Sequence, residues 1–221
     1  MTNAIAERNA NVTRVLSGLV PKKDMTTLLE GVQKVERLDK VLLVLLDGSG
    51  SMMDIMDGDT KIRLAWRVFQ QELMPNMAGW AYGVILFNSK VDWIIQPQVS
   101  TTALVSTLPP RAGGTTAMGG ALQLAWYWVK THAKEARFIL LSDGLPTDLA
   151  KDHIIELASN NRNIPVDCVG IGKGQNSYDP VFLRNLSKTT GGVFTEVHSV
   201  KVLANTIHQL SPTNRPLLGT V

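Results

Sequence analysis

The sequence predicts an α/β protein with a doubly wound, mostly parallel six-stranded sheet, one antiparallel edge strand, and helices on both faces. Three observations support this fold class. Short apolar runs alternate with segments of helical periodicity along most of the chain. Several of these runs lack polar alternation, as expected for strands that are covered on both faces. One connection between neighbouring strands is too short for a parallel crossover and indicates a hairpin.

The first half of this domain contains three expected strands and one long helix. Residues 41–46 form the first apolar run, which we place at the centre of the sheet. A helix is expected over 60–73, because its apolar residues recur at helical spacing and Pro75 follows. Strands are expected at 81–87 and 91–95, and the short link between them predicts that they pair antiparallel.

The second half continues the alternation of helices and strands. We expect strands at 138–141, 166–171 and 192–197, and helices at 101–108, 117–132, 151–161, 180–188 and 200–210. Around this domain, residues 38–211, the sequence indicates an N-terminal helical extension (1–37) and a C-terminal tail (212–221). The extension contains two amphipathic patterns, which pack either on the sheet domain or on another subunit.

Composition is that of a soluble globular protein. Of the 221 residues, 44% are hydrophobic and 19% are charged, which excludes a disordered or fibrous chain. The net charge of +3 includes no basic block, so nucleic-acid binding has no support. No run approaches the roughly 20 apolar residues of a membrane helix, and the first residues lack the pattern of a secretory signal. We therefore expect a cytoplasmic protein, in which the lone Cys168 is a small buried hydrophobic residue.

Polar residues gather where the expected strands end. Asp47-Gly48-Ser49-Gly50-Ser51 follows the first strand, and Asp143 follows the strand at 138–141. The loop Gly113-Gly114-Thr115-Thr116 leads into a helix at the same edge. Ligands of doubly wound sheets bind at this edge, outside the carboxyl ends of the strands. Carboxylates and hydroxyls are ligands that a hard divalent cation prefers, so together these loops predict a metal site.

These residues carry a close resemblance to a known family. Asp47, Ser49 and Ser51 match the DxSxS signature of the von Willebrand factor A (VWA) family, Thr115 its threonine loop, and Asp143 its second aspartate. The chain thus resembles an intracellular prokaryotic or phage-type member of that family, with its Rossmann-like fold and its metal-ion-dependent adhesion site (MIDAS). The resemblance implies that Asp47, Ser49, Ser51, Thr115 and Asp143 hold the metal.

The resemblance also implies a function. The expected ion is Mg²⁺, with Mn²⁺ or Ca²⁺ as alternatives, and an Asp or Glu of a protein partner completes its coordination shell. Intracellular members of the family work beside AAA+ ATPases or within larger assemblies, so an adaptor of an AAA+ ATPase is one expectation. The alternative is a structural subunit of a phage particle or secretion-like complex, in which the site forms a fixed interface.

Other interpretations were weighed against the metal site. Each motif alone is typical of a turn or a helix cap. A serine hydrolase would use Ser51, Asp143 and either His198 or His208, but the glycines of a nucleophile elbow are missing around the serines. The glycine loops also lack P-loop spacing. We therefore expect a binding module and no enzyme.

The loop after Ser51 is long and acidic. In one interpretation it is a solvated turn in which Asp59 or Thr60 caps the following helix. In the other, it rims the metal site and presents an adaptable apolar surface to the partner. The residues of that predicted rim are Met52, Met53, Asp54, Ile55 and Met56.

Overall fold

The structure is a computed structural model that describes residues 37–99, 108–172 and 178–215. The chain divides into two units, residues 1–36 and 37–221, and the described residues all belong to the second. The N-terminal helices, the helix at 101–108 apart from its last residue, and the chain beyond residue 215 lie outside the described residues. The predicted domain boundaries therefore stay predictions.

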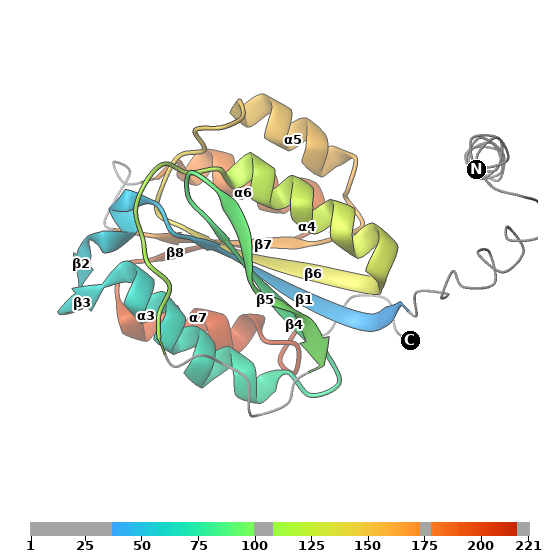
Figure 1. The fold of residues 1–221 in the computed structure, drawn as a ribbon, viewed down its shortest axis with the longest axis horizontal. Coiled ribbons are helices and arrows are strands. Elements are labelled where there is room, and N and C mark those ends of the chain that lie inside the picture. Colours follow the sequence, from blue (N-terminus) through green and yellow to red (C-terminus); the bar gives the residue numbers. More distant parts are fainter. Residues whose placement is uncertain (1–36, 100–107, 173–177, 216–221) are drawn as a thin grey trace, which may run out of the picture. The chain divides into compact units, whose positions relative to one another are not determined.

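A six-stranded sheet forms the centre of the domain and confirms the predicted fold class (Figure 1). The strand order is β5-β4-β1-β6-β7-β8, and all neighbours are parallel except the edge pair β4 and β5. The strands are β1 (Leu38–Asp47), β4 (Ala81–Phe87), β5 (Val91–Val99), β6 (Ala133–Ser142), β7 (Val166–Ile171) and β8 (Phe194–Val197). Chain order reverses around β1, so the topological switch point, where doubly wound sheets bind ligands, lies at the carboxyl ends of β1 and β6.

Within the described residues, five α-helices cover the two faces of the sheet. Figure 1 shows α4 (Met118–His132), α5 (Lys151–Ser159) and α6 (Pro180–Thr190) on one face, and α3 (Lys61–Val68) and α7 (Val200–Leu210) on the other. Strand β1 supplies both cores, because its alternate side chains point to opposite faces. Val41, Leu43 and Leu45 are buried in the core on the α4 side. Leu42, Val44 and Leu46 belong to the core on the α3 side.

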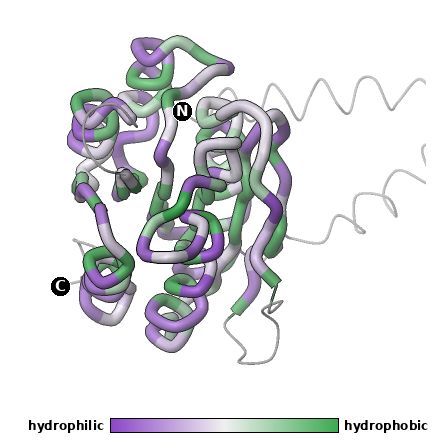
Figure 2. Tube along the Cα trace, turned by 90° about the vertical axis from the view of Figure 1, so that its left-hand side faces the viewer, coloured by the Kyte–Doolittle hydropathy of each residue, from purple (hydrophilic) through white to green (hydrophobic). Residues whose placement is uncertain are grey.

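The helices are amphipathic, as their positions require. In Figure 2 they alternate between hydrophobic and hydrophilic colours from residue to residue. In α7, for example, Leu203, Ile207 and Leu210 are buried while His208 remains exposed. This pattern places one apolar stripe of each helix on the sheet.

Three local features differ from the sequence predictions. The helix expected at 60–73 consists of α3 followed by a π-helical turn, Phe69–Leu73. Strand β5 runs on to Val99 through Pro97, which a strand tolerates at the edge of a sheet. Before α3, a small hairpin pairs β2 (Ile55–Met56) with β3 (Asp59–Thr60). Its turn residues, Asp57 and Gly58, both have positive φ, which is typical of the Asp-Gly turn of two-residue hairpins.

Two further expectations concern burial and membranes. Cys168 is fully buried in β7, as predicted, and burial raises the pKa of its thiol. Among the described helices, none has the length and apolar character needed to cross a membrane.

Candidate metal centre

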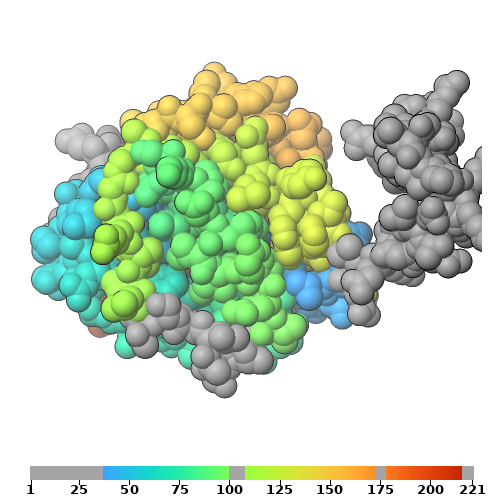
Figure 3. All heavy atoms as spheres, viewed as in Figure 1, coloured from blue at the N-terminus to red at the C-terminus, as the bar shows by residue number. Residues whose placement is uncertain are grey.

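Three loops meet at the carboxyl edge of β1 and β6. Backbone hydrogen bonds join the first two: Gly113 N donates to Gly48 O (2.7 Å), and Gly50 N donates to Gly114 O (3.1 Å). Thr147 N, in the loop after β6, donates to Thr116 O (3.0 Å). Figure 3 shows the segment from residue 108 to α4 at the surface, between residues 50–60 and β5. The three loops that carry the predicted ligands are thus held together by their own backbones.

Side-chain oxygens from two of these loops form a chain of close contacts. Ser49 Oγ and Ser51 Oγ lie 3.1 Å apart, and Ser51 Oγ donates to Asp143 Oδ1 at 2.7 Å. Asp47 Oδ1 accepts from the Ser49 backbone N–H at 2.8 Å. Asp47, Ser49 and Asp143 are buried, whereas Ser51 is exposed. The cluster therefore opens to solvent at Ser51.

The spacing of these oxygens fits a small divalent ion. In an octahedral Mg²⁺ shell with bonds of about 2.1 Å, adjacent ligand oxygens lie about 3.0 Å apart. The observed separations of 3.1 Å and 2.7 Å bracket that value. The described residues contain no group of three or more His, Cys, Asp or Glu side chains that could hold a metal. A metal here would therefore depend on the serine hydroxyls as well as on the two carboxylates.

The two threonines of the third loop occupy different surroundings. Thr115 is exposed, and both its backbone N–H and its hydroxyl contact Ser89 Oγ, at 3.0 and 3.2 Å. Thr116 is buried, and its Oγ1 would lie 3.1 Å from a Cβ placed on Gly144. Asp47 Oδ2 would lie 3.6 Å from the same point. The Thr116 hydroxyl is thus the one that faces the buried side of the site, while Thr115 as a ligand stays a prediction.

Burial disfavours the ionised form of the Asp47 carboxyl. Burial raises the pKa of its carboxyl from 3.8 to about 6, and the nearby charge of Asp143 adds to the rise. Hydrogen bonds from Ser142 and Ser49 oppose it, and Ser142 Oγ donates to Asp47 Oδ2 at 2.5 Å. Ser142 was not among the predicted site residues. Its position directly before Asp143, on the last residue of β6, was the available signal.

Lys61 is a second residue that the sequence analysis missed. Its side chain is buried, and its Nζ donates to Asp143 Oδ2 at 2.6 Å. The other contacts of the ammonium are Asp54 Oδ2 at 3.3 Å and Ser51 O at 3.5 Å. Lys61 is the first residue of α3, where a positive charge opposes the helix dipole. A basic residue at that position, next to an acidic loop, was the signal that could have identified it.

The loop after Ser51 agrees only in part with the predicted rim. Met53 and Ile55 are 52% and 69% exposed, and Asp54 is also exposed. Met52 and Met56 are buried at 0% and 4%, in the core beside α3, so their assignment to a contact surface is wrong. Met52 lies in the 3-10 turn Gly50–Met53, and Met56 lies on strand β2 of the hairpin that follows. The predicted cap is also incomplete: Thr60 is the N-cap residue of α3, but its side chain makes no capping hydrogen bond.

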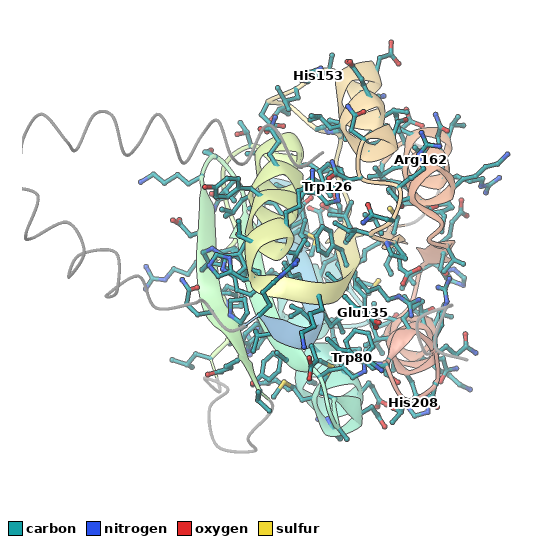
Figure 4. All side chains as sticks on the ribbon, turned by 90° about the vertical axis from the view of Figure 1, so that its right-hand side faces the viewer. Trp80, Trp126, Glu135, His153, Arg162 and His208 are labelled. Carbon is teal, nitrogen blue, oxygen red and sulfur yellow. The ribbon has the colours of Figure 1, made fainter. Side chains whose placement is uncertain are left out.

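The hydrolase alternative gains no support from the geometry. Ser51 Oγ donates to Asp143 directly, with no histidine between them. His208 instead faces Glu72, with 3.7 Å between its Nδ1 and Glu72 Oε2. Figure 4 shows His153 and His208 on helices that cover opposite faces of the sheet.

The comparison with known families decides the affiliation of the chain. A family model of the von Willebrand factor type A domain matches residues 42–209, most of the chain. The chain belongs to the VWA family. The match begins within β1 and ends in the last turn of α7, so it includes part of β1, the other five strands of the sheet and the candidate metal centre.

Solved VWA structures share the fold at low sequence identity. The chain superposes on a von Willebrand factor type A protein from Catenulispora acidiphila with a TM-score of 0.66 at 22% identity, covering 80% of this chain and 42% of that one. For the ArnB paralog VWA2 from Sulfolobus acidocaldarius, the TM-score is 0.64 at 20% identity, with coverage of 79% and 45%.

A third structure is described with a metal. Proximal thread matrix protein 1 from the mussel byssus, with a zinc-occupied MIDAS motif, gives a TM-score of 0.58 at 17% identity, with coverage of 80% and 46%. The present VWA chain thus spans less than half the length of each of these three chains. No curated protein matches it in sequence.

Proposed function

We propose that this VWA domain is a divalent-metal-dependent protein-binding module in the cytoplasm. Asp47, Ser49, Ser51, Thr115 and Asp143 would hold the ion, which we take to be Mg²⁺, with Mn²⁺ or Ca²⁺ as alternatives. The observation that carries the proposal is the run of oxygens from Ser49 through Ser51 to Asp143, at 3.1 and 2.7 Å. These are the spacings of adjacent ligands around a small octahedral ion.

Each residue has a distinct task in this proposal. Ser49 and Ser51 offer neutral oxygens, and Asp47 and Asp143 supply the negative charge. Ser142 and the Ser49 N–H orient Asp47 by donating to its two oxygens. When bound, the ion supplies an electrophilic position at the solvent-exposed side of the cluster, where a partner's Asp or Glu binds. The exposed Met53 and Ile55 lie on the loop that follows and offer apolar contacts to the same partner.

The partner follows from the family resemblance and is an AAA+ ATPase or another component of an intracellular assembly. A zinc-occupied MIDAS motif in a structure of similar fold is consistent with the proposed metal. A fixed interface within a phage particle or secretion-like complex is the alternative, in which partners remain bound without metal.

The first test is a calorimetric titration of the purified protein with Mg²⁺. We expect one binding site in the wild type and no binding in the double variant Ser49→Ala/Ser51→Ala. Ser159→Ala is the matched control, because the hydroxyl of this serine donates to Ile155 O within its own helix. If the double variant binds Mg²⁺ as tightly as the wild type, the ion is held elsewhere and the proposal is wrong.

The second test concerns the partner. Affinity capture from the native host is run with Mg²⁺ and with chelator, using the wild type and Asp47→Ala. We expect the same partners to disappear in chelator and in the variant. Partners that stay bound in both conditions would indicate the fixed-interface alternative.

A further inference from the structure

Lys61 places an ammonium group inside the proposed metal centre. Lysine side chains are almost never buried unless they are paired. Here the side chain is 8% exposed, and its Nζ lies 2.6 Å from Asp143 Oδ2. The three N–H groups of an ammonium match three oxygens: Asp143 Oδ2, Asp54 Oδ2 and Ser51 O. The lysine is therefore fixed in place.

The contacts of Asp143 divide its two oxygens between different tasks. Oδ2 accepts from Lys61, while Oδ1 accepts from Ser51 Oγ, on the side where the predicted ligands gather. Because both oxygens are engaged, rotation of the carboxylate would break a buried contact. Lys61 thus orients Asp143 so that one defined oxygen faces the ion.

The charges of the centre do not cancel. Asp47 and Asp143 contribute two buried negative charges and Lys61 one buried positive charge, so the protein presents a net charge of −1 to the ion. Asp54, which also touches Lys61, has a side chain that is 68% exposed, and water screens its charge. A divalent ion in this centre leaves an excess charge of +1. That excess favours one further anionic ligand and disfavours a neutral one.

We propose that Lys61 tunes the metal centre by charge, weakening its affinity for the divalent ion and strengthening the affinity of the loaded centre for a carboxylate partner. This proposal rests on the metal-dependent binding proposed above. It assigns Lys61 as a positioning and specificity-determining residue with two effects of opposite sign. A purely structural role would change both affinities in the same direction.

The test measures both affinities in the same variants. Lys61→Met removes the charge at similar length, and Lys61→Arg keeps it. Lys134→Met is the control, because it removes an ammonium that is paired to Asp39 at the exposed surface. Mg²⁺ affinity is measured by calorimetry. Carboxylate affinity is measured with acetate on the Mn²⁺-loaded protein by water proton relaxation, since an entering carboxylate displaces water from the ion.

We expect Lys61→Met to bind Mg²⁺ at least about tenfold more tightly and acetate at least about tenfold more weakly than the wild type. Lys61→Arg and Lys134→Met should stay close to the wild type in both measurements. Lys61→Gln replaces Lys61→Met if the methionine variant does not fold.

Three results would overturn the proposal. They are a loss of both affinities in Lys61→Met, no change in either, and a Lys61→Arg variant that behaves like Lys61→Met. A wild type that binds no divalent ion would instead refute the proposed function itself. The two failures are therefore distinguishable.

Discussion

Replacing Asp47 by Asn should stabilise the metal-free protein at neutral pH and abolish its metal binding. Burial raises the pKa of the Asp47 carboxyl to about 6, so the folded protein carries this charge at a cost in stability. Asparagine keeps the shape without the charge. Its Oδ1 can accept from the Ser49 N–H as Asp47 Oδ1 does now, and its amide can donate to Ser142 Oγ, which reverses the hydrogen bond that Ser142 Oγ now donates to Asp47 Oδ2.

The magnitude and the sign follow from the raised pKa. Between pH 3.8 and about 6 the folded state binds more protons than the unfolded state, so the free energy of unfolding falls as pH rises through this window. The rise in pKa from 3.8 to about 6 corresponds to about 3 kcal/mol. The stability gained by Asp47→Asn should therefore be small near pH 4 and reach about 3 kcal/mol above pH 7.

The assay is urea unfolding in chelator at several pH values between 4 and 7.5, with the difference between variant and wild type as the readout. Asp39→Asn is the control, because Asp39 lies on the same strand but its pKa is lowered by Lys134. Added Mg²⁺ should then stabilise the wild type and leave Asp47→Asn unchanged. Two results would refute the reasoning. One is an Asp47→Asn variant that is less stable than the wild type in chelator at pH 7.5. The other is a difference in the free energy of unfolding between variant and wild type that is the same at every pH.

Two further substitutions test the loops around the site. Met52→Ala removes a fully buried side chain and should lower the free energy of unfolding by about 2–5 kcal/mol in the same urea assay. Ile55 is exposed, so Ile55→Ala should change this free energy by less than about 0.5 kcal/mol. Equal effects of the two substitutions would mean that the loop packs differently. Gly114→Ala forces an L-residue to φ +86° with its Cβ 2.4 Å from Ser89 Oγ, and we expect a loss of about 1–2 kcal/mol together with weaker Mg²⁺ binding in calorimetry. Gly79→Ala is its control, since Gly79 has φ +75° and nothing within 4 Å of the added Cβ; unchanged Mg²⁺ affinity in Gly114→Ala would show that this loop does not shape the site.

The sheet, and the meeting of the predicted ligand loops at one of its edges, could be predicted because both depend on short-range patterns. A short apolar run such as 41–46, followed directly by turn residues, is typical of a strand buried on both faces, and a parallel sheet places all such strand ends at one edge. The placement of Asp47 and Asp143 at this edge follows directly from this rule. The backbone bonds between the Gly113–Gly114 and Gly48–Gly50 loops then supply the convergence that the motif spacing predicts.

The loop after Ser51 could not be predicted in the same way. Whether a loop methionine is buried depends on the path of the backbone, and the four-residue spacing of Met52 and Met56 does not determine that path. The Asp57-Gly58 pair is the signal that the prediction did not use. It forms the turn of a two-residue hairpin, in which Ile55 faces outward and Met56 faces the core. The hairpin also brings Asp54 beside Lys61, a contact between residues seven positions apart.

The two carboxylates of the centre are unequal, and this inequality bears on how the site works. Asp143 has an ammonium at 2.6 Å, whereas the contacts of Asp47 come from the neutral donors Ser49 and Ser142. A bound cation would therefore stabilise the ionised carboxylate of Asp47 most, because that charge is buried beside another carboxylate. Lys61 meanwhile keeps the total negative charge too small to neutralise a divalent ion. If the proposed function holds, Asp47 would provide the main drive for metal binding, and the charge left over would provide the drive for binding an acidic partner.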